Sequence, residues 1–231
     1  MRRTNQFVAL AIVAAGTLAA SAAIAAPTPD RIRGTVSAVS SGSVTVHTTD
    51  GKDVSVALTT KTGYLNVLPS SLDKVESGSY IGTATKTVGG KLIALEVVVF
   101  PPEMKGTGDG HYAWDKIPDT TLSGKSTTSS SMTNGSVTAV QAPGQKVNSS
   151  MTNGSVTTAS SSGGAKQITV TYKGGKQSVL VPPTAPIVTF KKTTMSDLTV
   201  GKTVFVRGLD DGGKVTAQGV VIGTKGANPP M

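Results

Sequence analysis

Apolar and polar residues alternate along most of the chain after Arg31, and glycine-rich turns interrupt the alternation. In the first such stretch Ile32, Gly34 and Val36 share one face, with polar residues between them. A period of two is typical of strands that bury one face, and the Asp50-Gly51 pair marks a tight hairpin. The pattern therefore predicts an all-β protein made of short antiparallel strands.

The same order of strands is predicted twice. Residues 31–103 contain five strand-like segments, with a long connection after the third that could hold one helical turn near Ser70 to Val75. Residues 165–223 repeat this order, and the last hairpins correspond closely: GGKLIA at residues 89–94 matches GGKVTA at residues 212–217. Such a match is the signature of an internal repeat. We therefore expect two related copies of one small fold.

Five short strands with one long connection suit a five-stranded OB-like barrel, and a two-sheet sandwich is the alternative. We place the first barrel at residues 31–103 and the second at residues 154–226. Small barrels bury a modest share of their surface, so the two copies are expected to pack on each other. Residues 104–153 hold an aromatic and glycine-rich segment and then mostly Ser, Thr, Gly and Asn, and they are expected to be a linker.

Nine residues of this polar region occur twice. SSMTNGSVT spans Ser130 to Thr138 and returns unchanged at Ser149 to Thr157. Both copies resemble the first predicted strand, since GSVTAV and GSVTTA follow the pattern of GTVSAV, which starts at Gly34. The chain thus offers two candidate first strands for the second barrel. We expect one copy to fill that position and the other to extend the linker or add an edge strand, and the sequence leaves open which copy does which.

The first residues have the features of an export signal. Arg2 and Arg3 precede an apolar run that starts at Phe7, and the small residues up to Ala25 suit a signal peptidase. We expect residues 1–25 to be removed and the remaining protein to be periplasmic or secreted. The apolar run is short for a membrane span, which needs about 20 strongly apolar residues, so no transmembrane span is expected after cleavage.

The chain is basic and contains no cysteine. Its formal charge is +9, or +7 without Arg2 and Arg3, and the lack of cysteine excludes disulfides and thiolate metal sites. Between Asp119 and Asp197 there is no carboxylate, whereas lysines recur, and a segment of one charge sign can attract polyanions. The candidate polyanion contacts are Lys173, Lys176, Lys191 and Lys192. The alternative is that these lysines only keep the barrel surface solvated.

Two parts of the chain carry a family resemblance. GTVSAVSSGSVTVHTTDGKDVSV occupies residues 34–56, and GHYAWD at residues 110–115 is followed by SMTN at residues 131–134. Together they resemble a bacterial family of exported β-barrel proteins of unknown function and its two-barrel members. The resemblance implies an envelope location and no established activity. Some members carry a metal-transporter permease label, which the lack of expected membrane spans argues against. The doubled Met-Thr-Asn departs from the single copy that the resemblance implies.

The most unusual composition lies in PPEMKGTGDGHYAWD, residues 101–115, which contains the only tryptophan. Thioether and imidazole groups suit Cu(I) or Ag(I), and an indole face can cover such a cation. The candidate metal site consists of Met104, His111 and Trp114, with Met132 or Met151 as further ligands. The alternative is that the tryptophan and its neighbour Tyr112 anchor the linker on the first barrel and leave the histidine exposed.

Two motifs of common enzyme classes are missing from the chain. It has no Gly-x-Ser-x-Gly, and Gly124-Lys125-Ser126 lacks the strand and helix that flank a phosphate-binding loop. We therefore expect no enzymatic activity and no cofactor. The sequence favours a non-enzymatic exported binding or scaffold protein of the cell envelope, whose partner is an anionic polymer or another envelope protein. A periplasmic protein that binds Cu(I) or Ag(I) is the alternative, and a hydrolase whose carboxylates the sequence does not identify is a third candidate. Nucleic acid is not expected as a partner, because we expect the protein to be exported and only Tyr172 lies in a clearly basic strand.

Overall fold

The computed structural model describes residues 26–122, 126–141 and 164–229, and in these residues the prediction of an all-β protein is confirmed. Thirteen strands form one continuous mixed sheet. The strands are β1 (Thr28–Val39), β2 (Ser43–Thr48), β3 (Asp53–Ala57), β4 (Gly63–Pro69), β5 (Tyr80–Val88), β6 (Lys91–Val99), β7 (Gly110–Pro118), β8 (Thr127–Gln141), β9 (Lys166–Tyr172), β10 (Gly175–Val181), β11 (Ile187–Thr193), β12 (Thr203–Asp211) and β13 (Lys214–Gly223). The short 3-10 helices are η1 (Leu72–Lys74), η2 (Pro102–Met104) and η3 (Met195–Asp197).

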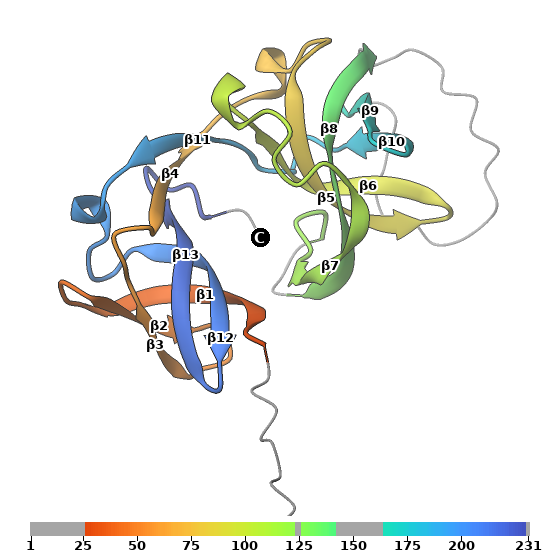
Figure 1. Ribbon diagram of the computed structural model, residues 1–231. Coiled ribbons are helices and arrows are strands. Elements are labelled where there is room, and N and C mark those ends of the chain that lie inside the picture. Colours follow the sequence, from red (N-terminus) through yellow and green to blue (C-terminus); the bar gives the residue numbers. More distant parts are fainter. Residues whose placement is uncertain (1–25, 123–125, 142–163, 230–231) are drawn as a thin grey trace, which may run out of the picture.

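Five strands of the sheet close into ring one, which consists of β1, β2, β3, β12 and β13. β1 pairs with β2 and β12, β2 pairs with β3, and β12 pairs with β13, all antiparallel. A short parallel pairing between β13 and β3 closes the ring. All five strands contribute apolar side chains to one buried cluster, so the interior of ring one is a packed core. In Figure 1 the orange and blue strands of this ring lie together at the lower left.

Ring two consists of β5, β6, β8, β9 and β10. β8 pairs with β5 and β9, β5 pairs with β6, and β9 pairs with β10, all antiparallel. A short parallel pairing between β10 and β6 closes it. Its core is a separate buried cluster to which all five strands contribute. The remaining strand, β7, pairs with β8 outside this ring.

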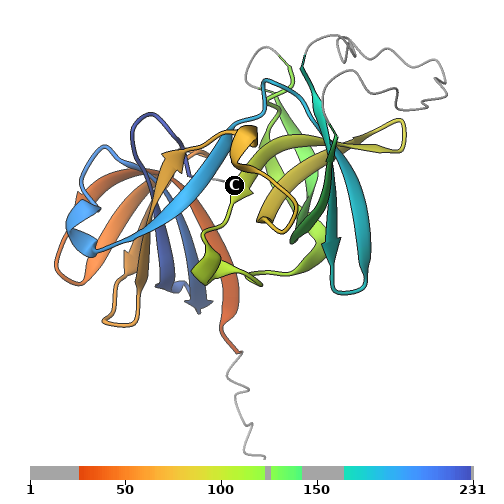
Figure 2. The ribbon, with the colours of Figure 1, turned by 90° about the horizontal axis from the view of Figure 1, so that it is seen from above.

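Neither ring consists of consecutive strands, so the predicted division at residues 31–103 and 154–226 needs correction. Each ring joins three strands of one repeat to the last two strands of the other repeat, which Figure 2 shows as mixed colours on both sides. The predicted linker at residues 104–153 also needs correction, because β7 and β8 lie within it. The physical reason is that the two repeats share one strand order. The alternation of apolar residues in a strand therefore suits pairing with a strand of its own repeat and with the equivalent strand of the other repeat equally well.

The long connections form a bridge between the rings. β4 and β11 pair antiparallel with each other, while β4 also pairs in parallel with β13 and β11 with β6. Val67, Val98 and Val188 form a buried cluster at this bridge, and Phe100 and Phe190 pack against it. The helical turn predicted in the first connection is present as η1.

Equivalent strands of the two halves of the sheet pair with equivalent registers. Val215 pairs with Val56 to close ring one. Leu92 lies 123 positions before Val215, and Val179 lies 123 positions after Val56. These two residues pair with each other to close ring two. The parallel pairings of β4 with β13 and of β11 with β6 are related by the same shift of 123 positions. Equal registers at these equivalent places support the predicted internal repeat.

β8 has in ring two the place that β1 has in ring one. The first copy of the nine-residue repeat, Ser130 to Thr138, forms most of β8, and Ser136 pairs with Thr171 of β9. A second barrel that starts at residue 154 is therefore wrong for the first strand of ring two. The second copy at residues 149–157 lies outside the described residues, as does the predicted signal peptide at residues 1–25.

A glycine is required at the equivalent point of β1 and β8. A Cβ on Gly34 would lie 2.0 Å from the carbonyl oxygen of His47, and one on Gly135 would lie 2.3 Å from that of Thr171. Any larger residue would push the paired strands apart, so glycine here permits close approach of two backbones. A shift of register typical of a β-bulge follows in both strands.

Candidate functional site

The Met-Thr-Asn motif of β8 lies between β5 and β7. Met132, Thr133 and Asn134 are 8 %, 0 % and 6 % exposed. β5 pairs with one edge of this segment and β7 with the other. Because successive residues of a strand point to opposite faces, Met132 and Asn134 share one face and Thr133 lies on the other.

Asn134 holds the glycine-rich turn that precedes β7. Its amide nitrogen donates to the carbonyl oxygen of Gly108 at 3.0 Å and to the hydroxyl of Tyr112 at 3.2 Å. Its amide oxygen lies over Gly82 of β5, where an added Cβ would be only 2.4 Å away. The glycine in β5 therefore provides the space in which the asparagine fits.

Tyr80 of β5 holds the same turn. Its hydroxyl donates to the carbonyl oxygen of Thr107 at 3.1 Å and lies 3.3 Å from a carboxylate oxygen of Asp109. Burial, and then the charge of Asp109, raise the pKa of Tyr80 to about 12, so the phenol stays a neutral donor. The second carboxylate oxygen of Asp109 accepts a hydrogen bond from the backbone amide of Lys173 at 2.7 Å, which ties the turn to the β9–β10 hairpin.

His111 of β7 contacts ring two through its side chain. Its Nδ1 lies 2.8 Å from the Thr133 hydroxyl, and its imidazole stacks on Tyr172 with the ring centroids 6.2 Å apart. Tyr172 is the last residue of β9, so the contact joins β7 to the start of the β9–β10 turn. Thr133 is fully buried, and a nucleophile needs access to its substrate, so this pair is not arranged for attack.

Trp114 and Asp115 of β7 contact β1 of ring one. The Asp115 carboxylate lies 2.9 Å from Nη1 of Arg31 and 2.8 Å from Nη2 of Arg33. The Arg31 guanidinium lies over the Trp114 indole, 4.1 Å from the ring centroid. Burial lowers the pKa of Arg33 and Asp115 offsets part of that effect, while an arginine still keeps its charge. These contacts connect the two rings independently of the bridge.

The structure does not bring the predicted metal ligands Met104, His111 and Trp114 to one point. Trp114 contacts Tyr112 and so lies on the face of β7 opposite His111, and an arginine already covers its ring. Met104 ends η2. Among the described residues no group of three or more His, Cys, Asp or Glu could hold a metal ion. Of the two further candidate ligands, Met132 is buried, and Met151 lies outside the described residues.

The four predicted polyanion contacts are exposed and lie on two separate elements. Lys173 and Lys176 flank the β9–β10 turn of ring two, beside the Tyr172–His111 stack. Lys191 and Lys192 lie in the second half of β11, where that strand pairs with β4. Figure 2 shows β11 running from ring two toward ring one, away from that hairpin. The structure therefore groups the first pair with His111 and separates it from the second pair.

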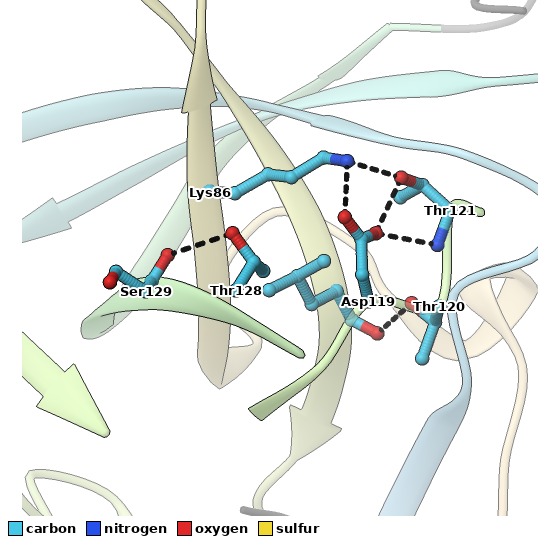
Figure 3. Close-up of polar contacts among 7 residues, drawn as sticks. Lys86, Asp119, Thr120, Thr121, Thr128 and Ser129 are labelled. Atoms are coloured by element: carbon cyan, nitrogen blue, oxygen red, sulfur yellow. Dashed lines mark hydrogen bonds and ion pairs between the residues drawn. The ribbon is translucent and has the colours of Figure 1, made fainter. Parts of the chain in front are cut away.

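A buried ion pair, which was not predicted from the sequence, holds the end of β7 in place. Nζ of Lys86 lies 2.7 Å from Asp119 and 2.6 Å from the Thr121 hydroxyl, and the Lys86 and Asp119 side chains are 14 % and 5 % exposed. The carboxylate also accepts hydrogen bonds from the amide and hydroxyl of Thr121 (Figure 3). Burial alone would raise the pKa of Asp119, but these hydrogen bonds outweigh it and lower that pKa. The only local signal is the Asp-x-Thr spacing, which is typical of a turn.

These features define a class of protein, an all-β chain whose two repeats exchange strands to build two closed rings. Comparisons with protein-family models, with curated proteins and with solved structures found no match to the chain. The family resemblance of the sequence therefore remains an expectation. In the described residues no helix has the length and hydropathy to cross a membrane.

Proposed function

We propose that this protein is a non-enzymatic exported binding protein of the cell envelope that contacts an anionic polymer through ring two. We interpret each ring as an OB-like barrel, because each has five strands in which the third and fifth pair in parallel to close it. OB-like barrels commonly bind extended polymers over their second and third strands. In ring two these strands are β9 and β10, so the fold supports the proposal by analogy.

One observation carries the proposal, the aromatic and basic surface at the β9–β10 turn. The imidazole of His111 stacks on Tyr172, and Lys173 and Lys176 follow within four residues. Both lysines are exposed, and neither takes part in an ion pair among the described residues. Stacked rings offer an apolar platform for a sugar or another flat group, and free ammonium groups attract phosphate or carboxylate.

The proposed location depends on the predicted signal peptide. Cleavage after Ala25 would leave a chain that starts at Ala26, shortly before β1. The mass of the protein recovered from the periplasm or the medium tests this directly. A mass that still includes residues 1–25 would contradict export by this route.

The binding proposal is tested by retention of the mature protein on immobilised heparin, used as a model anionic polysaccharide. We expect elution by salt, because contacts between exposed charges are screened as ionic strength rises. Replacing both Lys173 and Lys176 with alanine should lower the salt concentration needed for elution. The matched control replaces Lys191 and Lys192, which also removes two positive charges but from another element. If the two double variants elute together, net charge and not this surface determines retention.

A further inference from the structure

The place of β8 in ring two makes strict demands on sequence. Met132 packs in a buried cluster with Ile117, and Val137 packs in the core of ring two. Asn134 makes the hydrogen bonds that hold the glycine-rich turn. Gly135 has no room for a side chain. Few sequences would satisfy all these demands.

The chain contains a second segment that satisfies them. Residues 149–157 repeat residues 130–138 letter for letter. A shift of 19 positions would therefore place Met151, Asn153 and Gly154 where Met132, Asn134 and Gly135 lie. Each buried contact of the nine residues would be made again by the same residue type.

The flanking residues and loops also allow this shift. Toward β9, Ala139 and Val140 would be replaced by Thr158 and Ala159. Val140 is partly buried against the core, so this exchange favours the first copy, by roughly tenfold for two methyl groups that are only partly buried. The connection from β7 would grow from 8 to 27 residues while the connection to β9 would shrink from 24 to 5. Five residues suffice for a hairpin, and loop entropy changes slowly with length.

We propose that the groove that β8 occupies, between β5 on one side and β7 and β9 on the other, accepts either copy of the repeat. The second copy replaces the first when the chain shifts by 19 residues through this groove. The exchange moves the surplus segment from one end of β8 to the other, about 45 Å along an extended strand of this length. The surplus nine residues thus belong to the connection between β8 and β9 in one register and to the connection between β7 and β8 in the other.

Cysteine pairs test the exchange directly, because the natural chain has no cysteine. The hydroxyls of Thr138 and Thr171 lie 3.3 Å apart on the surface, so Thr138→Cys with Thr171→Cys reports the first register. Thr157→Cys with Thr171→Cys reports the second, and we expect it to oxidise about ten times more slowly. The control is Ser161→Cys with Thr171→Cys, which is closer in sequence but out of register. Oxidation of the Thr157 pair no faster than this control would overturn the proposal.

Glycine variants give an independent test. Gly135→Val blocks the first register, so the second copy should take over and the folding equilibrium constant should fall only about tenfold. Gly34→Val blocks the equivalent place in β1, for which the chain has no second copy, and should abolish folding of the protein. Gly135→Val combined with Gly154→Val should be as damaging as Gly34→Val. If Gly135→Val alone is as damaging, the second copy does not enter the groove.

Discussion

At the scale of single residues, the fold depends on places where a side chain is missing. Gly82 makes room for Asn134, whose amide then holds the turn before β7. The alternation of apolar and polar residues in the sequence places such a glycine on one face of a strand, but it does not show which side chain fills the space above the glycine. The partner lies more than fifty positions away in the sequence, so only the pairing of β5 with β8 reveals it.

We predict that Gly82→Ala destabilises the protein by about 2–3 kcal/mol, because the new Cβ would overlap the Asn134 amide and press on Phe100. Urea unfolding of the mature protein measures the change. Gly42→Ala is the matched control, since an added Cβ there meets nothing within 4 Å and no left-handed backbone is required. Equal stability of the two variants would contradict this account of the Gly82 contact.

A second residue-scale prediction concerns acid. The lowered pKa of Asp119 means that its carboxylate binds a proton more weakly in the folded state than in the unfolded state. Its contribution to stability is therefore complete above the unfolded pKa, about 3.9, and is lost as pH falls through the lower folded value. Asp119→Asn should cost about 3 kcal/mol at pH 7, because it leaves Lys86 buried without its counter-ion.

The measurement is the free energy of unfolding of both proteins between pH 7 and pH 2. The difference between them should shrink toward the acid end, where the wild-type carboxylate also loses its charge. Asp73→Asn is the control, because Asp73 pairs with Lys166 while its side chain is 86 % exposed. We expect that variant to follow the wild type throughout, and a constant difference for Asp119→Asn would refute the assignment.

At the scale of elements, β7 links parts of the molecule that the sheet order keeps apart. Among the described strands it pairs only with β8, yet its side chains reach β1 through Asp115 and Trp114. Its anchoring role was one of the two interpretations of the aromatic segment from sequence. From the sequence, the aromatic segment was expected to contact the first barrel alone. In the structure Ile117 of β7 packs on ring two and Asp115 contacts ring one. Both contacts depend on the strand exchange, which local sequence does not reveal.

We predict that Asp115→Asn weakens the contact between β7 and β1. Without the carboxylate, Arg31 loses the partner that keeps it over Trp114, so the tryptophan should become more exposed. Because Trp114 is the only tryptophan, its emission should shift to the red and its quenching by acrylamide should increase. The loss of stability should be about 1 kcal/mol or less, since these side chains are about one-third exposed. Asp50→Asn, which removes the exposed Asp50–Lys52 pair of ring one, should leave the emission unchanged.

At the scale of the whole molecule, each ring needs both halves of the chain. β12 and β13 complete ring one, whereas β5 and β6 complete ring two. The bridge of β4 and β11 adds a third shared region with its own buried cluster. We therefore expect the protein to unfold as one cooperative unit, although its strands form two rings with separate cores.

A cut in the chain tests this arrangement. A protease site inserted at residues 123–125 would separate β1 to β7 from β8 to β13. We predict that the two fragments stay together in size-exclusion chromatography and separate only in denaturant, because both rings contain strands of both fragments. Two barrels built from consecutive strands would instead part after cleavage. The uncut protein with the same insertion is the control for the insertion itself.

From the sequence alone, alternation and turns such as Asp50-Gly51 were enough to predict the strands of the two rings, the internal repeat and the all-β class. The strands β4, β7 and β11 were not predicted, because they lie in segments that were interpreted as connections or linker. It also singled out Lys173, Lys176, His111 and Trp114, but not which of them meet. The tertiary structure alone decided that β3 closes on β13 and β10 on β6, that the first copy of the repeat is β8, and that His111 faces Tyr172 while Trp114 faces Arg31. The reason is physical: two repeats with one strand order offer equivalent partners to each edge, and the choice between them depends on packing between residues far apart in the chain.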